Sequence, residues 1–148
     1  PRPLEPMRFR SWRYFHDYAG GNMTDQGTHL MDVVQWFMNA STPRSAVSQG
    51  FVAKMTGAEH PDVFSATFSY DGFLVNWTLD YGNAFQNGWS IAFHGDKGTL
   101  ILDDAGFRLF REPWKKGAAP DIEEASPVPV EAHIQNFLDC IRSRKEPN

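Results

Sequence analysis

The amino-acid sequence predicts an α+β fold, in which a largely antiparallel, open-faced β-sheet has helices packed on one face. Apolar residues with helical spacing occur in an early segment and again at the end of the chain. Between them, apolar and polar residues alternate in short runs separated by Gly and Asp, as in antiparallel hairpins. A chain of 148 residues can enclose one core, so we expect a single domain over residues 1–148.

Composition excludes several classes of protein. The 14 Lys and Arg residues are outnumbered by 18 Asp and Glu, so no basic excess is available for a phosphate backbone and we expect no nucleic-acid partner. Apolar runs are far shorter than the roughly 18 residues that span a bilayer, and a signal-peptide pattern is lacking. We therefore expect no membrane association and a cytoplasmic protein. Cys140 is the only cysteine, which excludes an internal disulfide.

The first segments are interpreted from their prolines and aromatic residues. PRPLEP has three prolines in six positions, so residues 1–8 are expected to form an extended connector. Residues 9–15 alternate aromatic and polar side chains and predict a strand or strand end. Residues 23–38 predict a helix, because apolar residues recur at i, i+3, i+4 and i+7. These apolar residues are Leu30, Val33, Val34 and Phe37.

The middle of the chain predicts an antiparallel meander of at least five strands. The predicted strands are residues 46–53, 63–70, 73–81, 89–94, 99–103 and 107–111. Asp71-Gly72 between the second and third is the two-residue signal of a type I′ hairpin. Residues 112–129 are rich in Pro, Gly and Ala and predict a surface loop. A closing helix is indicated by Ile134, Phe137, Leu138 and Ile141.

The two predicted helices leave one face of the sheet uncovered. We expect that face to carry many Phe, Trp and Tyr side chains. Such a surface is most simply buried against a second copy of the chain, so the sequence predicts a homodimer or a larger homo-oligomer formed through the sheet face.

Three titratable residues share one edge of the first long helix. At about 100° per residue, Asp25, His29 and Asp32 fall within roughly 60° of one another and away from the apolar stripe. A carboxylate one turn before an imidazole can fix its tautomer and raise its basicity, as proton abstraction from a hydroxyl requires. Two other interpretations stay open: solvated acidic residues beside a packing histidine, or a metal site formed by all three.

The segment that contains these residues resembles a known family. WRYF, Gly-Gly and DQGTHLMD are similar to the start of the second domain of Gfo/Idh/MocA oxidoreductases. Later segments of that domain are similar, more weakly, to HGDKGTLIL and to the closing HIQNFLDCIRSRKEPN. The matching positions are Gly20, Gly21, Asp25, Gly27, His29 and Asp32.

The resemblance implies one domain of a two-domain dehydrogenase. It implies a fold like the C-terminal domains of Gfo/Idh/MocA and glyceraldehyde-3-phosphate dehydrogenase-like enzymes, and a separate N-terminal Rossmann domain that binds NAD or NADP. His29 would transfer a proton and Asp25 would contact the substrate beside it, with Trp12, Arg13 and Tyr14 as weaker candidates for lining the pocket. Implied substrates are sugars, cyclitols and related polyols.

Two motifs of such an enzyme are absent from this sequence. It has neither an E-K-P segment nor a G-x-G-x-x-G turn between a strand and a helix, so this chain by itself is expected to be inactive. Two alternatives remain within the same fold: a sugar-sensing or regulatory binding protein without catalysis, and an NAD-dependent glycosidase.

Overall fold

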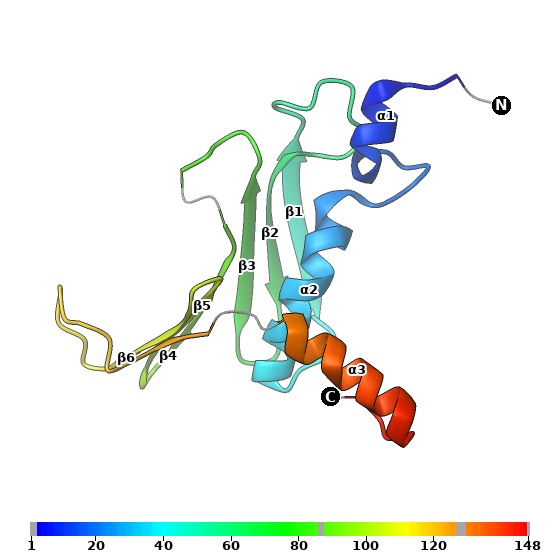
Figure 1. Cartoon of the computed structure of the whole chain (residues 1–148). Helices are drawn as coiled ribbons and strands as arrows, with labels where there is room; N and C mark the ends of the chain where they lie inside the picture. Colours follow the sequence, from blue (N-terminus) through cyan, green and yellow to red (C-terminus); the bar gives the residue numbers. More distant parts are fainter. Residues whose placement is uncertain (1–2, 86–87, 127–129, 148) are drawn as a thin grey trace. The chain divides into compact units, whose positions relative to one another are not determined.

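A computed structural model describes residues 3–85, 88–126 and 130–147, and the chain divides into two compact units (Figure 1). Unit 1 is Pro1–Asn87 and unit 2 is Gly88–Asn148. Antiparallel strands and a few helices build both units, so the predicted α+β class is confirmed. The strands form two hydrogen-bonded sheets, however, where the sequence suggested one meander.

The start of unit 1 is helical. Helix α1 is Pro6–Arg10, and a 3₁₀ turn, η1, is Trp12–Tyr14, so the predicted strand at residues 9–15 is wrong. Pro6 is tolerated because the first helical position needs no N–H donor. The guanidinium of Arg8 holds this region together: it lies 4.3 Å from the centre of the Phe15 ring and pairs with three carboxylates. These belong to Glu5, Asp17 and Glu59.

Three antiparallel strands follow helix α2, which is Gly21–Met38 and confirms the predicted helix. They are β1 (Ser45–Phe51), β2 (Val63–Ser69) and β3 (Leu74–Asp80), in the order β1-β2-β3. In the turn after β2, Tyr70 N donates to Phe73 O at 3.0 Å and Gly72 has φ +84°. A type I′ turn also needs a positive φ at Asp71, but the φ of Asp71 is not positive. The predicted turn type is therefore wrong.

Helix α2 lies against one face of this sheet (Figure 1). Its Gly27 approaches the Trp77 ring of β3, and its Gln35 donates to the hydroxyl of Tyr70 at 3.1 Å. The core contains Val34 of α2 together with Phe64 and other side chains. These others are Tyr14, Phe15, Ala66 and Tyr70.

The opposite face of the sheet differs from the expectation. The strand register places rows of Ser, Thr, Asn and Gln on it, together with the exposed Val47, Phe51 and Leu74. Phe64 and Trp77 point instead toward α2, because alternate residues of a strand face opposite sides. An aromatic-rich open face is therefore not found on this sheet.

Unit 2 contains a four-stranded antiparallel sheet and a helix. The strands, in the order β4-β5-β6-β7, are β4 (Ser90–Gly95), β5 (Gly98–Asp103), β6 (Gly106–Arg111) and β7 (Ile122–Ala125). Strand β7 lies inside the predicted loop of residues 112–129, so that prediction is wrong for these four residues; residues 127–129 lie outside the described ones. A Cβ at Gly98 would be 2.4 Å from the carbonyl oxygen of Phe110, so the close pairing of β5 and β6 requires glycine there.

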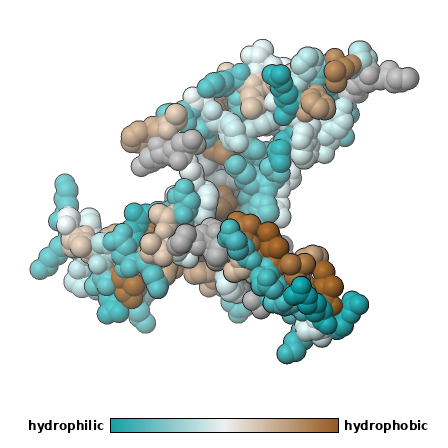
Figure 2. Space-filling model, in the orientation of Figure 1, coloured by the Kyte–Doolittle hydropathy of each residue, from teal (hydrophilic) through white to brown (hydrophobic). Residues whose placement is uncertain are grey.

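Helix α3, Val130–Ser143, confirms the predicted closing helix. Its apolar stripe is exposed, with Ile134, Phe137, Leu138 and Ile141 between 39% and 58% accessible. Figure 2 shows hydrophobic side chains along this helix. Among the described helices, none has the length and apolar character needed to cross a bilayer.

Candidate functional site

The predicted titratable residues lie on helix α2. Gly27 and Val34 of this helix are buried, while His29 and Asp32 are exposed and Asp25 is half-buried. His29 follows Asp25 by one turn, roughly 6 Å along the helix axis. As the spacing predicts, this edge of α2 is left outside the core.

The carboxylate of Asp25 binds Arg13 of η1. Nε of Arg13 donates to Oδ2 of Asp25 at 2.6 Å, and the guanidinium carbon lies 4.5 Å from the centre of the Trp12 ring. The Arg13 side chain is 45% exposed and that of Asp25 is 37% exposed. A charge-assisted hydrogen bond and an aromatic face therefore orient a guanidinium that still reaches solvent. We call Trp12, Arg13 and Asp25 the Arg13 cluster.

The imidazole of His29 has no hydrogen-bond partner among the residues that the structure describes. The sequence suggested that Asp25 fixes its tautomer, but in this structure the partner of Asp25 is Arg13. The guanidinium donates a charge-assisted hydrogen bond to this carboxylate, which stabilises the pairing of Arg13 with Asp25. The structure thus brings together Trp12, Arg13 and Asp25, and leaves His29 exposed on the next turn.

Tyr14 belongs to the core, whereas the resemblance suggests it as a weaker candidate for lining the pocket. Its side chain is 4% exposed, its hydroxyl accepts a hydrogen bond from Nδ2 of Asn22, and its ring meets that of Tyr81 edge-on. Burial, and secondarily the neighbouring Tyr81, raises the pKa of Tyr14 to about 12. The buried Tyr14–Asn22 pair fixes the first turn of α2 against η1. Sequence reasoning missed Asn22, whose one signal is its place directly after Gly20-Gly21.

Two glycines of the matching motif have structural roles. Gly21 has φ +73°, and a Cβ there would lie 2.8 Å from Cβ of His60. A Cβ at Gly27 would lie 2.4 Å from the Trp77 ring, so only glycine lets α2 approach the sheet this closely. Gly21 and Gly27 thus position α2 by packing. Any chemical role of the motif therefore belongs to its polar residues.

A cavity of about 200 Å³ lies beside the first turn of α2. His60 lines it; its Nε2 is 2.8 Å from the carbonyl oxygen of Ala19 and its ring centre is 4.1 Å from that of His16. Of the predicted site residues, none is among the lining residues. The lining residues are Gly20, Gly21, Asn22, Met23, Ser48, Gln49, Gly50, His60, Pro61 and Phe64.

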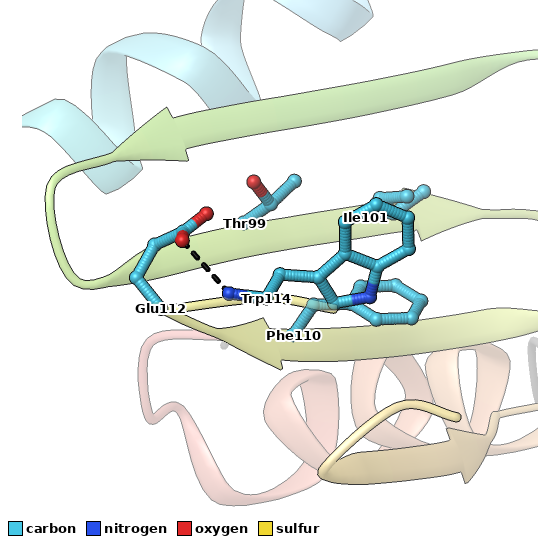
Figure 3. A pocket seen from close by; sticks show the side chains of 5 residues that line it. All are labelled: Thr99, Ile101, Phe110, Glu112 and Trp114. Atoms are coloured by element: carbon cyan, nitrogen blue, oxygen red, sulfur yellow. Dashed lines mark hydrogen bonds between the residues drawn. The ribbon is translucent and has the colours of Figure 1, made fainter. Parts of the chain in front are cut away.

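Unit 2 has a cavity of its own, of about 250 Å³, on one face of its sheet (Figure 3). The indole of Trp114 lies over the face that carries Thr99, Ile101 and Phe110, and its backbone N donates to Oε2 of Glu112 at 2.9 Å. Glu112 is the one ionisable residue in this lining, so the cavity offers no acid and base pair. This cavity was not predicted, because residues 112–129 were expected to form a surface loop.

The described residues do not fit a dinucleotide or a metal ion. A dinucleotide cradle needs a parallel strand leading into a helix, whereas every strand pairing in the described ranges is antiparallel. Within the same ranges, no three His, Cys, Asp or Glu side chains gather as metal ligands would.

The antiparallel sheets, helix α2 and the motif that it carries together define a domain of the α+β class. The chain belongs to the family described as the GFO/IDH/MocA C-terminal domain, whose model matches residues 1–101. No curated relative matches the chain.

Two solved structures are similar in fold. One is the WlbA dehydrogenase from Bordetella pertussis in complex with NADH and UDP-GlcNAcA, at 23% identity and a TM-score of 0.64, covering 99% of this chain and 44% of that one. The other is an oxidoreductase from Agrobacterium radiobacter in complex with NAD+, L-tartaric acid and magnesium, at 14% identity and a TM-score of 0.59, covering 98% and 45%. The chain thus spans less than half the length of either protein.

Proposed function

We propose that this chain is the substrate-binding domain of an oxidoreductase that transfers hydride between NAD or NADP and a hydroxyl-bearing carbon of a sugar, cyclitol or related polyol. One observation carries the proposal: His29 stands at the motif position, exposed, one turn beyond the Asp25 carboxylate. The two structural neighbours, solved with NADH and NAD+, support a nicotinamide cofactor. We assign that cofactor to a Rossmann domain of the complete protein.

His29 transfers the proton of the reaction. In oxidation its imidazole accepts the proton of the substrate hydroxyl as the carbonyl forms, and in reduction it returns that proton to the oxygen. The hydride itself is exchanged with the nicotinamide cofactor. Because His29 is exposed in this chain, its imidazole is accessible to a substrate from solvent.

The Arg13 cluster orients the substrate. Oδ1 of Asp25 has no hydrogen bond from a described residue, so it can accept one from a second substrate hydroxyl while Oδ2 stays bound to Arg13. The ring of Trp12, 40% exposed, offers an apolar surface to the C–H face of a polyol. Tyr14 acts indirectly. Its buried side chain fixes the 3₁₀ turn η1, which also carries Trp12 and Arg13.

Replacement of His29 by Ala in the complete protein tests this function. We expect kcat to fall by about 10²- to 10⁴-fold, as for loss of a general acid–base residue, with cofactor binding and the circular dichroism spectrum unchanged. His133→Ala, an exposed histidine on α3, is the matched control and should keep wild-type turnover. Unchanged turnover in the His29 variant would remove the assigned role.

We further propose that the complete protein forms a homodimer, or a larger homo-oligomer, through the face of β1–β3 that α2 does not cover. Val47, Phe51 and Leu74 are each more than 60% exposed there, and their burial would contribute to association. Val47→Asp with Phe51→Asp should yield monomers in light scattering after size exclusion, whereas Trp36→Asp on α2 should not. A monomeric wild type, or an unchanged mass in the double variant, would contradict this.

A further inference from the structure

We infer that Arg13 binds an anionic group of the substrate, so that the complete protein prefers a hydroxylated acid to the corresponding neutral polyol. This inference rests on the proposed function and narrows its substrate class. The shared chemistry of the group is a planar or tetrahedral oxyanion, either a carboxylate or a phosphate ester.

The Nη1 and Nη2 donors of Arg13 are available to a ligand. A guanidinium carries five N–H donors, and in Arg13 only Nε is engaged, by Oδ2 of Asp25 at 2.6 Å. No residue in the described part of the chain accepts from its Nη1 or Nη2. Those two nitrogens form the fork that binds carboxylates and phosphates through parallel hydrogen bonds.

The orientation of this fork is set before any ligand arrives. Asp25 holds Nε, and the guanidinium lies over the Trp12 ring at 4.5 Å, so little rotamer freedom is left to lose on binding. With 45% of the side chain exposed, the remaining donors are accessible to a ligand.

A comparison with Arg8 shows what a purely structural arginine looks like in this chain. Arg8 also lies over an aromatic ring, that of Phe15, but its Nε, Nη1 and Nη2 are all used in contacts with carboxylates and its side chain is only 20% exposed. Arg13 faces a single carboxylate. The two arginines thus share a stacking geometry and differ in the number of donors left for a ligand.

The position of Arg13 also suits the proton transfer at His29. Its partner Asp25 lies one helical turn before His29, roughly 6 Å along the axis. We place the acidic group of the substrate at Arg13, beside Asp25, and a hydroxyl of the same substrate at His29, one helical turn further along α2.

The test compares three probes with one pyranose ring: D-glucuronate, D-glucose 6-phosphate and neutral D-glucose. Binding to the complete protein is measured by calorimetry, and turnover is measured with the cofactor present. We expect at least one of the two anions to bind about tenfold or more tightly than glucose, the value of one charged hydrogen bond. The anion that does so identifies carboxylate or phosphate as the natural group.

Variants separate a ligand contact from a structural tether. Arg13→Gln should abolish the preference for the anion, so that the anionic and neutral probes bind with similar affinity, and Arg13→Lys should restore part of it, because it returns the charge without the fork. Arg10→Gln, an exposed arginine of α1, should behave as wild type. Equal binding of all three probes by the wild type, no binding of either anion, or a preference that survives Arg13→Gln would overturn the inference.

Failure of this inference is distinguishable from failure of the proposed function. His29→Ala should lower kcat by about 10²- to 10⁴-fold and keep the anion preference. If that variant turns over normally, the assignment of His29 fails while the preference can still be measured. If the wild type oxidises neutral and anionic probes equally well, only the role of Arg13 fails.

Discussion

Replacement of Asp62 by Asn should destabilise unit 1 markedly. Asp62 precedes β2 and is 0% exposed. Its Oδ1 accepts a hydrogen bond from Ala53 N at 2.6 Å, and its Oδ2 accepts from Lys54 N at 2.8 Å and Met55 N at 2.7 Å. The carboxylate thus joins the chain after β1 to the start of β2. Burial by itself raises the pKa of Asp62, but the backbone hydrogen bonds outweigh it and the pKa is lowered.

The magnitude follows from these three hydrogen bonds. Asn retains one acceptor oxygen, so its NH₂ group must face at least one backbone N–H, which is left unsatisfied at a cost of about 1–3 kcal/mol. The remaining hydrogen bonds lose the charge-assisted part of their strength, about 1 kcal/mol in all. We expect a loss of about 3 kcal/mol in the free energy of unfolding of unit 1.

Urea denaturation followed by tryptophan fluorescence measures this loss. Asp71→Asn is the matched control, because the Asp71 side chain is 81% exposed and pairs with Arg44 only at the surface. That variant should change stability by less than about 0.5 kcal/mol. Equal stabilities of the two variants would show that the Asp62 carboxylate does not anchor the loop.

Three further outcomes are expected. Because the pKa of Asp62 is lowered, its stabilisation is complete above the unfolded-state pKa of about 3.9 and is lost as pH falls through the folded value, so urea titrations of the Asp62→Asn variant should show a weaker acid dependence than wild type. Gly27→Ala should lower Tm despite the better helix propensity of Ala, and Trp77→Leu should reduce that penalty in a double-mutant cycle. The raised pKa of Tyr14 means that stability is lost as pH rises from about 10 to about 12, and Tyr14→Phe should remove the most alkaline step of the tyrosine absorbance titration.

Local sequence patterns predicted the elements whose periodicity is strong. Helix α2 and strands β1 to β6 follow from spacing, because each has an apolar side that the core buries or a turn residue that bounds it. The failures have a different origin. Residues 9–15 alternate like a strand, yet Arg8 and its carboxylate partners hold them in helical turns. Strand β7 pairs antiparallel with β6, and this pairing leaves no local pattern in the sequence of residues 122–125.

The candidate site was predictable in composition and not in its contacts. Helical spacing places Asp25 and His29 one turn apart, and this much is confirmed. The partner that binds Asp25 comes from η1, 12 residues earlier, in a segment expected to be extended. Side chains that meet through tertiary structure leave no periodic signal, so the pairing of Arg13 with Asp25 could be found only in the structure.

The structure also sharpens the choice between an enzyme and a binding protein of the same fold. Gly21 and Gly27 are required by φ and by contact with His60 and Trp77, so a relative without catalysis would keep them for packing alone. Their presence therefore says nothing about chemistry. His29 has no such structural role, since it is exposed and makes no hydrogen bond to a described residue. We therefore base the proposed proton transfer on His29 and not on the two glycines.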